Sequence, residues 1–305
     1  MNRIWLSAVA VGVFAAGSGG APPGTPEAGK AGISVAPDAA VVTFVLMVSA
    51  ILFLVWSRTE ERSKPLRMLF CPWGPLDVAL GIAGFLLFLW SASLVVGTLV
   101  PKGQRDWMLA TTVTGVCGVC TSLLILFHVG RRYGLWPRDL GLRFDNWKRD
   151  LTLAGALLFL VIAVQVPLGE FFVYLHRRTG EPLQPQFLIS QMIEAPSLVA
   201  MAIMSLVAIT VAPFWEEFIF RGFVQPFLAR WLGVPGAIVL TAALFSAFHD
   251  PRSKFLMVPV MLFPLALALG YAYHRTQRLA APIFLHGLHN LVSVLLILAK
   301  RGGAG

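Results

Sequence analysis

The chain contains several stretches of about 20 residues that are apolar throughout, and this feature restricts its fold more than any other. A stretch of that length suits a helix that crosses the hydrocarbon core of a bilayer. Only 13% of the 305 residues are charged, against roughly 25% in soluble domains. Because lipid cannot pair backbone amides, a spanning segment must be a helix or part of a closed barrel. Barrel strands alternate apolar and polar residues, which these runs do not. The sequence therefore predicts an all-α, polytopic transmembrane helical bundle.

We expect about eight spans, because each long apolar run can form one. The first four are mostly plain apolar helices, whereas the last four contain nearly all of the ionisable residues within spans. The two halves show no internal repeat of the inverted-transporter kind. The predicted spans lie near Ala39–Trp56, Leu76–Val100, Trp107–Val129, Leu151–Tyr174, Ser197–Phe223, Pro235–His249, Phe255–Tyr273 and Ala280–Leu298.

The N-terminus, MNRIWLSAVAVGVFAAGSGG, resembles a secretory signal sequence, with an early arginine, an apolar stretch and then small residues. An uncleaved anchor helix is the alternative. The Gly, Ala and Pro residues that follow predict a linker without regular structure. We therefore divide the chain into four parts. These are a signal-like segment with its linker (1–38), N-terminal membrane helices (39–195), a second membrane domain (196–298) and a tail (299–305).

The net charge of +9 does not indicate nucleic-acid binding, because the basic residues are scattered among loops without interleaved aromatic residues. Lys and Arg are densest after the first and third predicted spans, so that face is predicted to be cytoplasmic. We expect a multi-pass integral protein of the cell membrane whose surroundings are membrane lipids. Cys117 and Cys120 form a CxxC inside an apolar run, where small residues packed in a helix are a better interpretation than a redox or zinc site.

The strongest candidate for chemistry is the segment VAPFWEEFIFRGF, residues 211–223. Charged groups within a span cost roughly 2.5–3.5 kcal/mol each on insertion scales and indicate function by default. On a helix, Glu217 and Arg221 are four residues apart, share a face and can form an ion pair. Glu216 points about 100° away, and a carboxylate in an apolar pocket suits a general base. The alternative is a salt-bridge cluster at a helix end.

Two further clusters lie in later spans. His249 follows Phe245 by one helical turn, although a lone histidine on an apolar helix is more often a packed core residue. His286 and Asn290 are four residues apart, and together they could donate to a developing oxyanion. A structural hydrogen bond between helices is the alternative. From their depths along the spans, these groups can meet in a cavity that opens to the cytoplasm, with His249 the deepest.

These residues, taken together, resemble the CPBP family of CAAX-processing and bacteriocin-processing membrane proteases, which are type II CAAX prenyl endopeptidase-like. Glu216, Glu217 and Arg221 match its EExxxR motif, Phe245 and His249 match FxxxH, and His286 and Asn290 match HxxxN. The motifs occur in the family's order over roughly residues 197–295. Each motif alone is weak, whereas the ordered set is specific.

The resemblance implies an intramembrane endopeptidase in which Glu216 acts with His249 to activate water. It further implies that His286 and Asn290 stabilise the oxyanion and that Glu217 and Arg221 hold the site together. The substrate would be a peptide or protein, and a lipidated one if the processing is of the CAAX type. An ion-coupled transporter with a carboxylate relay, and a non-catalytic scaffold or immunity protein on the same fold, are the alternatives.

The resemblance leaves metal dependence open, because the essential residues of the family are Glu and His. A zinc site, if present, would use Glu216, His249 and His286 as its ligands. The usual HExxH motif is absent, and a glutamate-activated water beside an oxyanion hole needs no metal. We therefore expect no cofactor, with a divalent metal such as zinc as the alternative.

Overall fold

The computed structural model describes residues 71–101, 105–180, 187–193, 195, 197–249 and 257–302. The regular elements in these ranges are all helices, and five of them are long and apolar enough to cross a membrane. The predicted all-α polytopic bundle is therefore confirmed. The signal-like segment, its linker and the predicted span near Ala39–Trp56 lie outside the described residues.

The chain forms two compact units, each made of two segments: Met1–Lys64 with Ile162–Pro185, and Pro65–Val161 with Gln186–Gly305. The described residues of the first unit, 162–180, are almost all the C-terminal part of one long helix, α6. The second unit contains the other helices and all of the candidate site residues. The predicted division of the chain at residue 196 stays a prediction.

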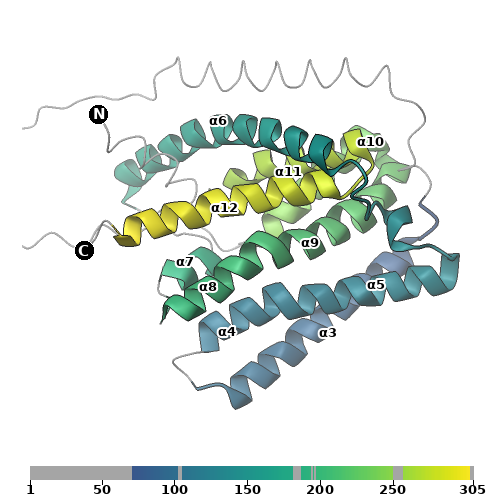
Figure 1. The fold of residues 1–305 in the computed structure, drawn as a ribbon, viewed down its shortest axis with the longest axis horizontal. Helices are drawn as coiled ribbons and strands as arrows, with labels where there is room; N and C mark the ends of the chain where they lie inside the picture. Colours follow the sequence, from purple (N-terminus) through teal and green to yellow (C-terminus); the bar gives the residue numbers. More distant parts are fainter. Residues whose placement is uncertain are drawn as a thin grey trace, which may run out of the picture. The chain divides into compact units, whose positions relative to one another are not determined.

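The helices are labelled in chain order, with η marking three π-helical segments and one 3₁₀ helix (Figure 1). The π-helical segments η3, η5 and η6 each continue directly into α-helices, so several labels share one uninterrupted helix. The bounds are α3 (Pro75–Leu99), α4 (Arg105–Thr112), η3 (Val113–Cys117), α5 (Gly118–Tyr133), η4 (Pro137–Leu140), α6 (Trp147–Thr179), α7 (Phe187–Ile193), α8 (Leu198–Leu206), η5 (Val207–Val211), α9 (Ala212–Glu217), η6 (Phe218–Val224), α10 (Gln225–His249), α11 (Met257–Thr276) and α12 (Ala280–Gly302).

A helical hairpin around Gly233 forms the centre of the second unit. Gly233 has φ 68°, a left-handed conformation that glycine adopts easily, and Pro235 follows it. The helix therefore continues to the residue before Gly233, beyond the predicted end of the fifth span at Phe223. Beyond the turn, α10 packs back against η6 and also against α11. The hairpin thus runs two long apolar helices side by side in opposite directions.

Helices α12 and α5 pack on either side of α9, which carries the paired glutamates (Figure 1). On the α5 side, the contact is closest at Gly118, where an added Cβ would overlap the indole ring of Trp215. Trp215 is also stacked on Phe85 of α3, with ring centroids 6.0 Å apart. Glycine at position 118 therefore lets α5 approach the helix that bears the site.

We predict that Gly118→Ala destabilises the protein by about 1–3 kcal/mol, because the new methyl group must displace a packed tryptophan. Gly97→Ala is the matched control: it lies inside α3, and its added Cβ would meet no atom within 4 Å. That substitution is expected to stabilise the helix by roughly 0.5–1 kcal/mol. Thermal unfolding in detergent measures both, and equal midpoints for the two variants would contradict the packing argument.

A second group of contacts fixes α3 to α5. The carboxylate of Asp77 accepts hydrogen bonds from the Gly74 amide (2.7 Å) and the Tyr133 hydroxyl (2.8 Å). His128 Nε2 lies 2.6 Å from the same carboxylate. These side chains drew no attention in the sequence, because they lie more than 50 positions apart along the chain. The buried carboxylate is therefore well satisfied and ties the two helices together.

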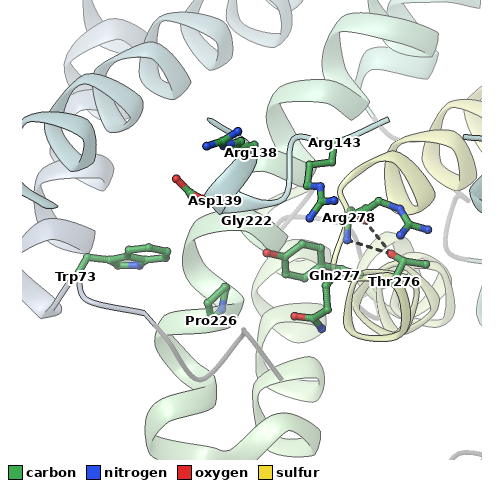
Figure 2. Close-up of a pocket in the computed structure, with 10 residues that line it drawn as sticks. Trp73, Arg138, Asp139, Arg143, Gly222, Pro226, Thr276, Gln277 and Arg278 are labelled. Atoms are coloured by element: carbon green, nitrogen blue, oxygen red, sulfur yellow. Dashed lines mark hydrogen bonds between the residues drawn. The ribbon is translucent and has the colours of Figure 1, made fainter. Parts of the chain in front are cut away.

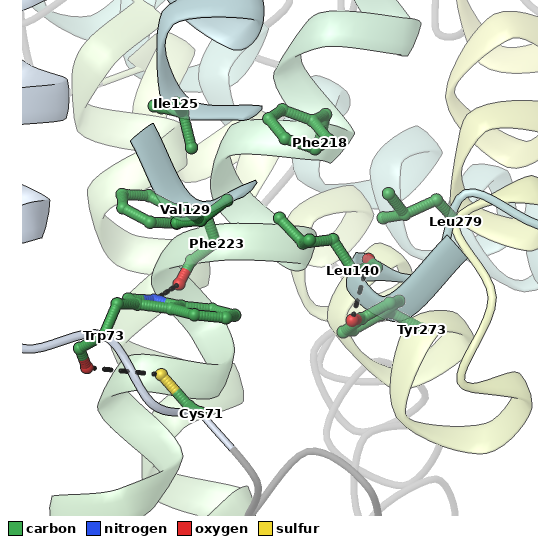
Figure 3. Close-up of a cluster of buried hydrophobic side chains, with 9 residues drawn as sticks. All are labelled: Cys71, Trp73, Ile125, Val129, Leu140, Phe218, Phe223, Tyr273 and Leu279. Carbon is green, nitrogen blue, oxygen red and sulfur yellow. Dashed lines mark hydrogen bonds between the residues drawn. The ribbon is translucent and has the colours of Figure 1, made fainter. Parts of the chain in front are cut away.

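An apolar cluster joins η6 to the segment before α3, to α5, to η4 and to the α11–α12 turn (Figure 3). Trp73 stacks on Phe223 with ring centroids 5.3 Å apart, and its indole N–H donates to the Phe223 carbonyl at 2.9 Å. Tyr273 donates to the Leu140 carbonyl at 3.3 Å. The cluster thus packs η6, which directly follows the candidate glutamates, against the neighbouring elements.

Cys71 in this cluster should be inert toward alkylating reagents. Burial raises the pKa of its thiol to about 12, and only 5% of the residue is exposed. Because the reactive form is the thiolate, the folded protein should react slowly at pH 8 and faster only as pH approaches the raised pKa. Mass spectrometry after iodoacetamide treatment checks this. Rapid labelling of Cys71 in the folded protein, with slower labelling after denaturation, would contradict it.

Candidate active site

The Gly233 hairpin brings His249 to the level of the paired glutamates. Glu217 lies 16 residues before Gly233 and His249 lies 16 residues after it. The two helices of the hairpin therefore bring them to the same level. The expectation that His249 lies deepest is therefore wrong, because the helix with the glutamates runs on to Gly233 before the chain turns back. The ring of Phe220, near the glutamates, is 5.2 Å from that of Phe245 across the hairpin.

Glu217 and Arg221 form a fully buried ion pair, with both side chains 0% exposed. Arg221 Nη1 donates to Glu217 Oε1 at 3.1 Å, and Nη2 donates to the carbonyl oxygen of Ala266 in α11 at 3.1 Å. The guanidinium carbon also lies 4.4 Å from the centre of the Phe245 ring, within range of a cation–π interaction. The pair therefore connects η6 to both α10 and α11.

Glu216 faces two imidazoles rather than the arginine. Its Oε2 lies 3.4 Å from His249 Nε2 and 3.9 Å from His286 Nε2, and only 7% of the residue is exposed. The three groups come from α9, α10 and α12, so the fold is needed to bring them together. A small polar site results, enclosed by apolar side chains.

The hydrogen-bond partners of His249 indicate where its protons lie. Its Nδ1 is 2.7 Å from the carbonyl oxygen of Phe245, which can only accept, so Nδ1 carries a hydrogen. In the neutral ring, Nε2 then presents a lone pair toward Glu216. A lone pair and a carboxylate repel each other unless a proton lies between them, on the imidazole, on the carboxyl group or in a bridging water. The two groups can therefore share one proton.

His286 connects the two glutamates. Its Nδ1 is 2.8 Å from Glu217 Oε1, a carboxylate oxygen that accepts, and its Nε2 faces Glu216. A carboxylate on one ring nitrogen fixes the orientation and the tautomer of the ring. The sequence did not predict this contact, because it joins residues 69 positions apart. His286 therefore links the buried ion pair of Glu217 and Arg221 to Glu216.

Asn290 lies one turn further along α12 and donates from Nδ2 to the Ala208 carbonyl oxygen in η5 at 2.7 Å. The two elements approach closely because residue 287 is glycine, where an added Cβ would lie 2.8 Å from the Ile209 carbonyl oxygen. A carboxamide has two N–H donors, so one remains after the bond to Ala208. The helix contact fixes the direction of that second donor.

Phe245 packs at the centre of this arrangement and is 0% exposed. Its ring centroid is 4.3 Å from the His249 ring and 5.7 Å from the His286 ring. The FxxxH motif identified Phe245 only as a residue one turn before His249. The sequence did not predict its contacts with two histidines and an arginine. The ring therefore acts as an apolar wall that sets the spacing of the polar groups.

The described residues contain no group of three His, Cys, Asp or Glu side chains arranged to hold a metal ion. The alternative ligand set of Glu216, His249 and His286 is therefore not arranged as a metal site in the described residues. A catalytic zinc site normally needs three protein ligands about 2.0–2.2 Å from the ion. Here His286 also uses Nδ1 on Glu217, which leaves only its Nε2 for any ligand.

The fold and the site together define a polytopic helical membrane protein with a buried acid–base site assembled from several helices. Within that class, residues 198–292 match the family model described as type II CAAX prenyl endopeptidase Rce1-like. The matched segment runs from α8 into α12 and contains every predicted site residue. The resemblance to CPBP intramembrane proteases is thus confirmed, and the match supports a CAAX-type intramembrane endopeptidase in general terms. No curated protein and no solved structure matches the chain.

Proposed function

We propose that the protein hydrolyses a peptide bond with a water molecule activated by Glu216 and His249. The observation that supports this proposal is the 3.4 Å separation of Glu216 Oε2 and His249 Nε2. The two groups lie on the two antiparallel helices of the Gly233 hairpin. A water molecule beside the pair, hydrogen-bonded to Glu216, can lose a proton to the carboxylate while its oxygen attacks the substrate carbonyl carbon. General base catalysis of this kind is worth typically ~10²–10⁴ in rate.

His286 and Asn290 are proposed to stabilise the negative oxygen that forms in the attack. Both lie on α12, and the remaining N–H of Asn290 and a protonated His286 Nε2 can donate to it. The Glu217 carboxylate on Nδ1 supports that charged form of His286. The proton taken from water then passes to the leaving amine nitrogen as the peptide bond breaks. Glu217 and Arg221 touch no reacting atom in this scheme and act by positioning.

The family match also guides the proposed substrate and setting. Because the matched family model is described as a type II CAAX prenyl endopeptidase, a prenylated CAAX peptide is the first substrate to try. We place the protein in the cell membrane with its site opening to the cytoplasmic side, as the distribution of Lys and Arg indicates. Comparison of protein termini between wild-type and Glu216→Gln cells tests the activity and identifies substrates. Identical termini in the two strains would reject the proposal.

Catalysis without metal is part of the same proposal. Incubation of the purified protein with EDTA or 1,10-phenanthroline, followed by dialysis, should leave the hydrolysis rate within about twofold of the untreated rate, because the scheme uses only protein groups. Elemental analysis of the same sample should show no stoichiometric zinc. Loss of activity on chelation that added zinc restores would show that the metal alternative, with Glu216, His249 and His286 as ligands, is correct.

A further inference from the structure

A pocket separate from the carboxylate–histidine site lies among the helix ends of the second unit (Figure 2). Its walls come from η4 and the loop after it, from η6 and the start of α10, and from the α11–α12 turn. Three arginines line it: Arg138, Arg143 and Arg278. Its volume of about 70 Å³ exceeds twice the roughly 30 Å³ of a water molecule, which leaves room for a small tetrahedral group.

Arg278 is a fixed cation in this pocket. Its Nε and Nη2 donate to the two carboxylate oxygens of Asp150 at 2.8 and 2.6 Å, and Asp150 is 0% exposed. The hydrogen bonds to Asp150 raise the pKa of Arg278 above its usual value. The bidentate contact holds the plane of the guanidinium.

The other two arginines are weakly engaged. Arg143 pairs with Asp145 at 3.2 Å, but both side chains are more than 40% exposed, and such surface pairs contribute little. Arg138 has no carboxylate within ion-pair distance among the residues that the structure describes. The one carboxylate in the lining, Asp139, accepts from the Trp136 amide at 2.9 Å and thereby caps η4. The pocket therefore presents more guanidinium donors than the protein itself satisfies.

The position of the pocket matches the level of lipid headgroups. The turn that joins α11 to α12, two candidate membrane spans, lines the pocket, so the pocket lies where these two spans leave the hydrocarbon core. Trp73 and Tyr273 form its apolar side, and Trp and Tyr are enriched at that interface. Basic pockets between helices at this level suit anionic headgroups. We propose that this pocket binds a phosphate group, through Arg138 and Arg143.

The phosphate could belong to a phospholipid headgroup or to a free phosphate, and titration calorimetry separates the two. The full-length protein, in a phosphate-free detergent, is titrated with short-chain phosphatidylglycerol in one arm and inorganic phosphate in the other. Arg138→Gln/Arg143→Gln removes two charges from the pocket. The matched control, Arg131→Gln/Arg149→Gln, removes two exposed charges from the same stretch outside the lining.

The pocket variant should raise the Kd by roughly tenfold or more, because charge-assisted hydrogen bonds to phosphate are lost, while the control should stay within about twofold. Binding of phosphatidylglycerol alone, with that pattern, supports a lipid headgroup site. Binding of inorganic phosphate with the same pattern supports a phosphate site with a soluble ligand. The proposal is overturned if neither probe binds, or if the two variants weaken binding equally. Circular dichroism of both variants checks that they are folded.

Discussion

Replacement of Glu216 by glutamine is expected to lower the rate of peptide hydrolysis by a factor of ~10²–10⁴ while the protein stays folded. Glutamine keeps the shape of the side chain but cannot take a proton from water. The amide would still lie beside His249 Nε2, so packing and the neighbouring ion pair of Glu217 should be unaffected. Initial rates on a prenylated CAAX peptide, with the protein in detergent, give the factor directly.

Glu170→Gln is the control for this substitution. Glu170 is also a glutamate in a membrane-spanning helix, α6, but its side chain is exposed. The Glu170→Gln protein should therefore cleave at the wild-type rate. Size-exclusion chromatography should show the same elution volume for the Glu216→Gln and Glu170→Gln proteins. A Glu216→Gln protein that is folded and cleaves as fast as Glu170→Gln would show that Glu216 is not the base.

The part of the site that the sequence predicts best lies within a single helix. The spacing of Glu217 and Arg221 requires only that the segment is helical, and the structure shows them paired at 3.1 Å. The direction of Glu216, about 100° away, follows from the same geometry. The π-helical turn of η6 starts just after Glu217 and does not break this pairing. Local helix geometry therefore sufficed for the division between the two glutamates.

Contacts between helices were less accessible. The depth of His249 depends on where the turn lies, and the apolar run gave no clear sign that the helix continues past Phe223 to Gly233. In the structure, the left-handed backbone of Gly233 and the nearby Pro235 mark the position of the turn. In the sequence, the tripeptide GVP is only a weak turn signal. An error of about 9 residues in one helix end changed the estimated depth by more than 10 Å.

Backbone partners were beyond reach for a different reason. The carbonyl oxygens of Ala266 and Ala208 accept from Arg221 and Asn290, and no side chain marks a carbonyl as a partner. The bond of His286 to Glu217 likewise depends on how α12 packs against α9. In a membrane bundle such packing follows from small residues, here Gly287, more than from hydrophobic pattern. The sequence predicted the candidate side chains but not the backbone contacts that orient them.

The buried ion pair gives the second large prediction. Arg221→Met is expected to destabilise the protein by about 3–5 kcal/mol, because it leaves the Glu217 carboxylate buried with one hydrogen-bond partner fewer. The substitution also removes the bond from Nη2 to the Ala266 carbonyl oxygen. Thermal unfolding in detergent, followed by tryptophan fluorescence, measures the loss. A midpoint equal to that of the wild type would mean that the pair contributes little to the fold.

The double variant Glu217→Gln/Arg221→Met separates stability from positioning. With both charges removed no unpaired ion is buried, so most of the stability lost in Arg221→Met should return, as expected when a whole buried pair is replaced. Hydrolysis should not return with it, because His286 then has an amide rather than a carboxylate on Nδ1, and the charged imidazole loses its support. A stable double variant with near wild-type activity would show that Glu217 and Arg221 serve only the fold. A stable and inactive one assigns them to the orientation of His286, and through it to the site around Glu216.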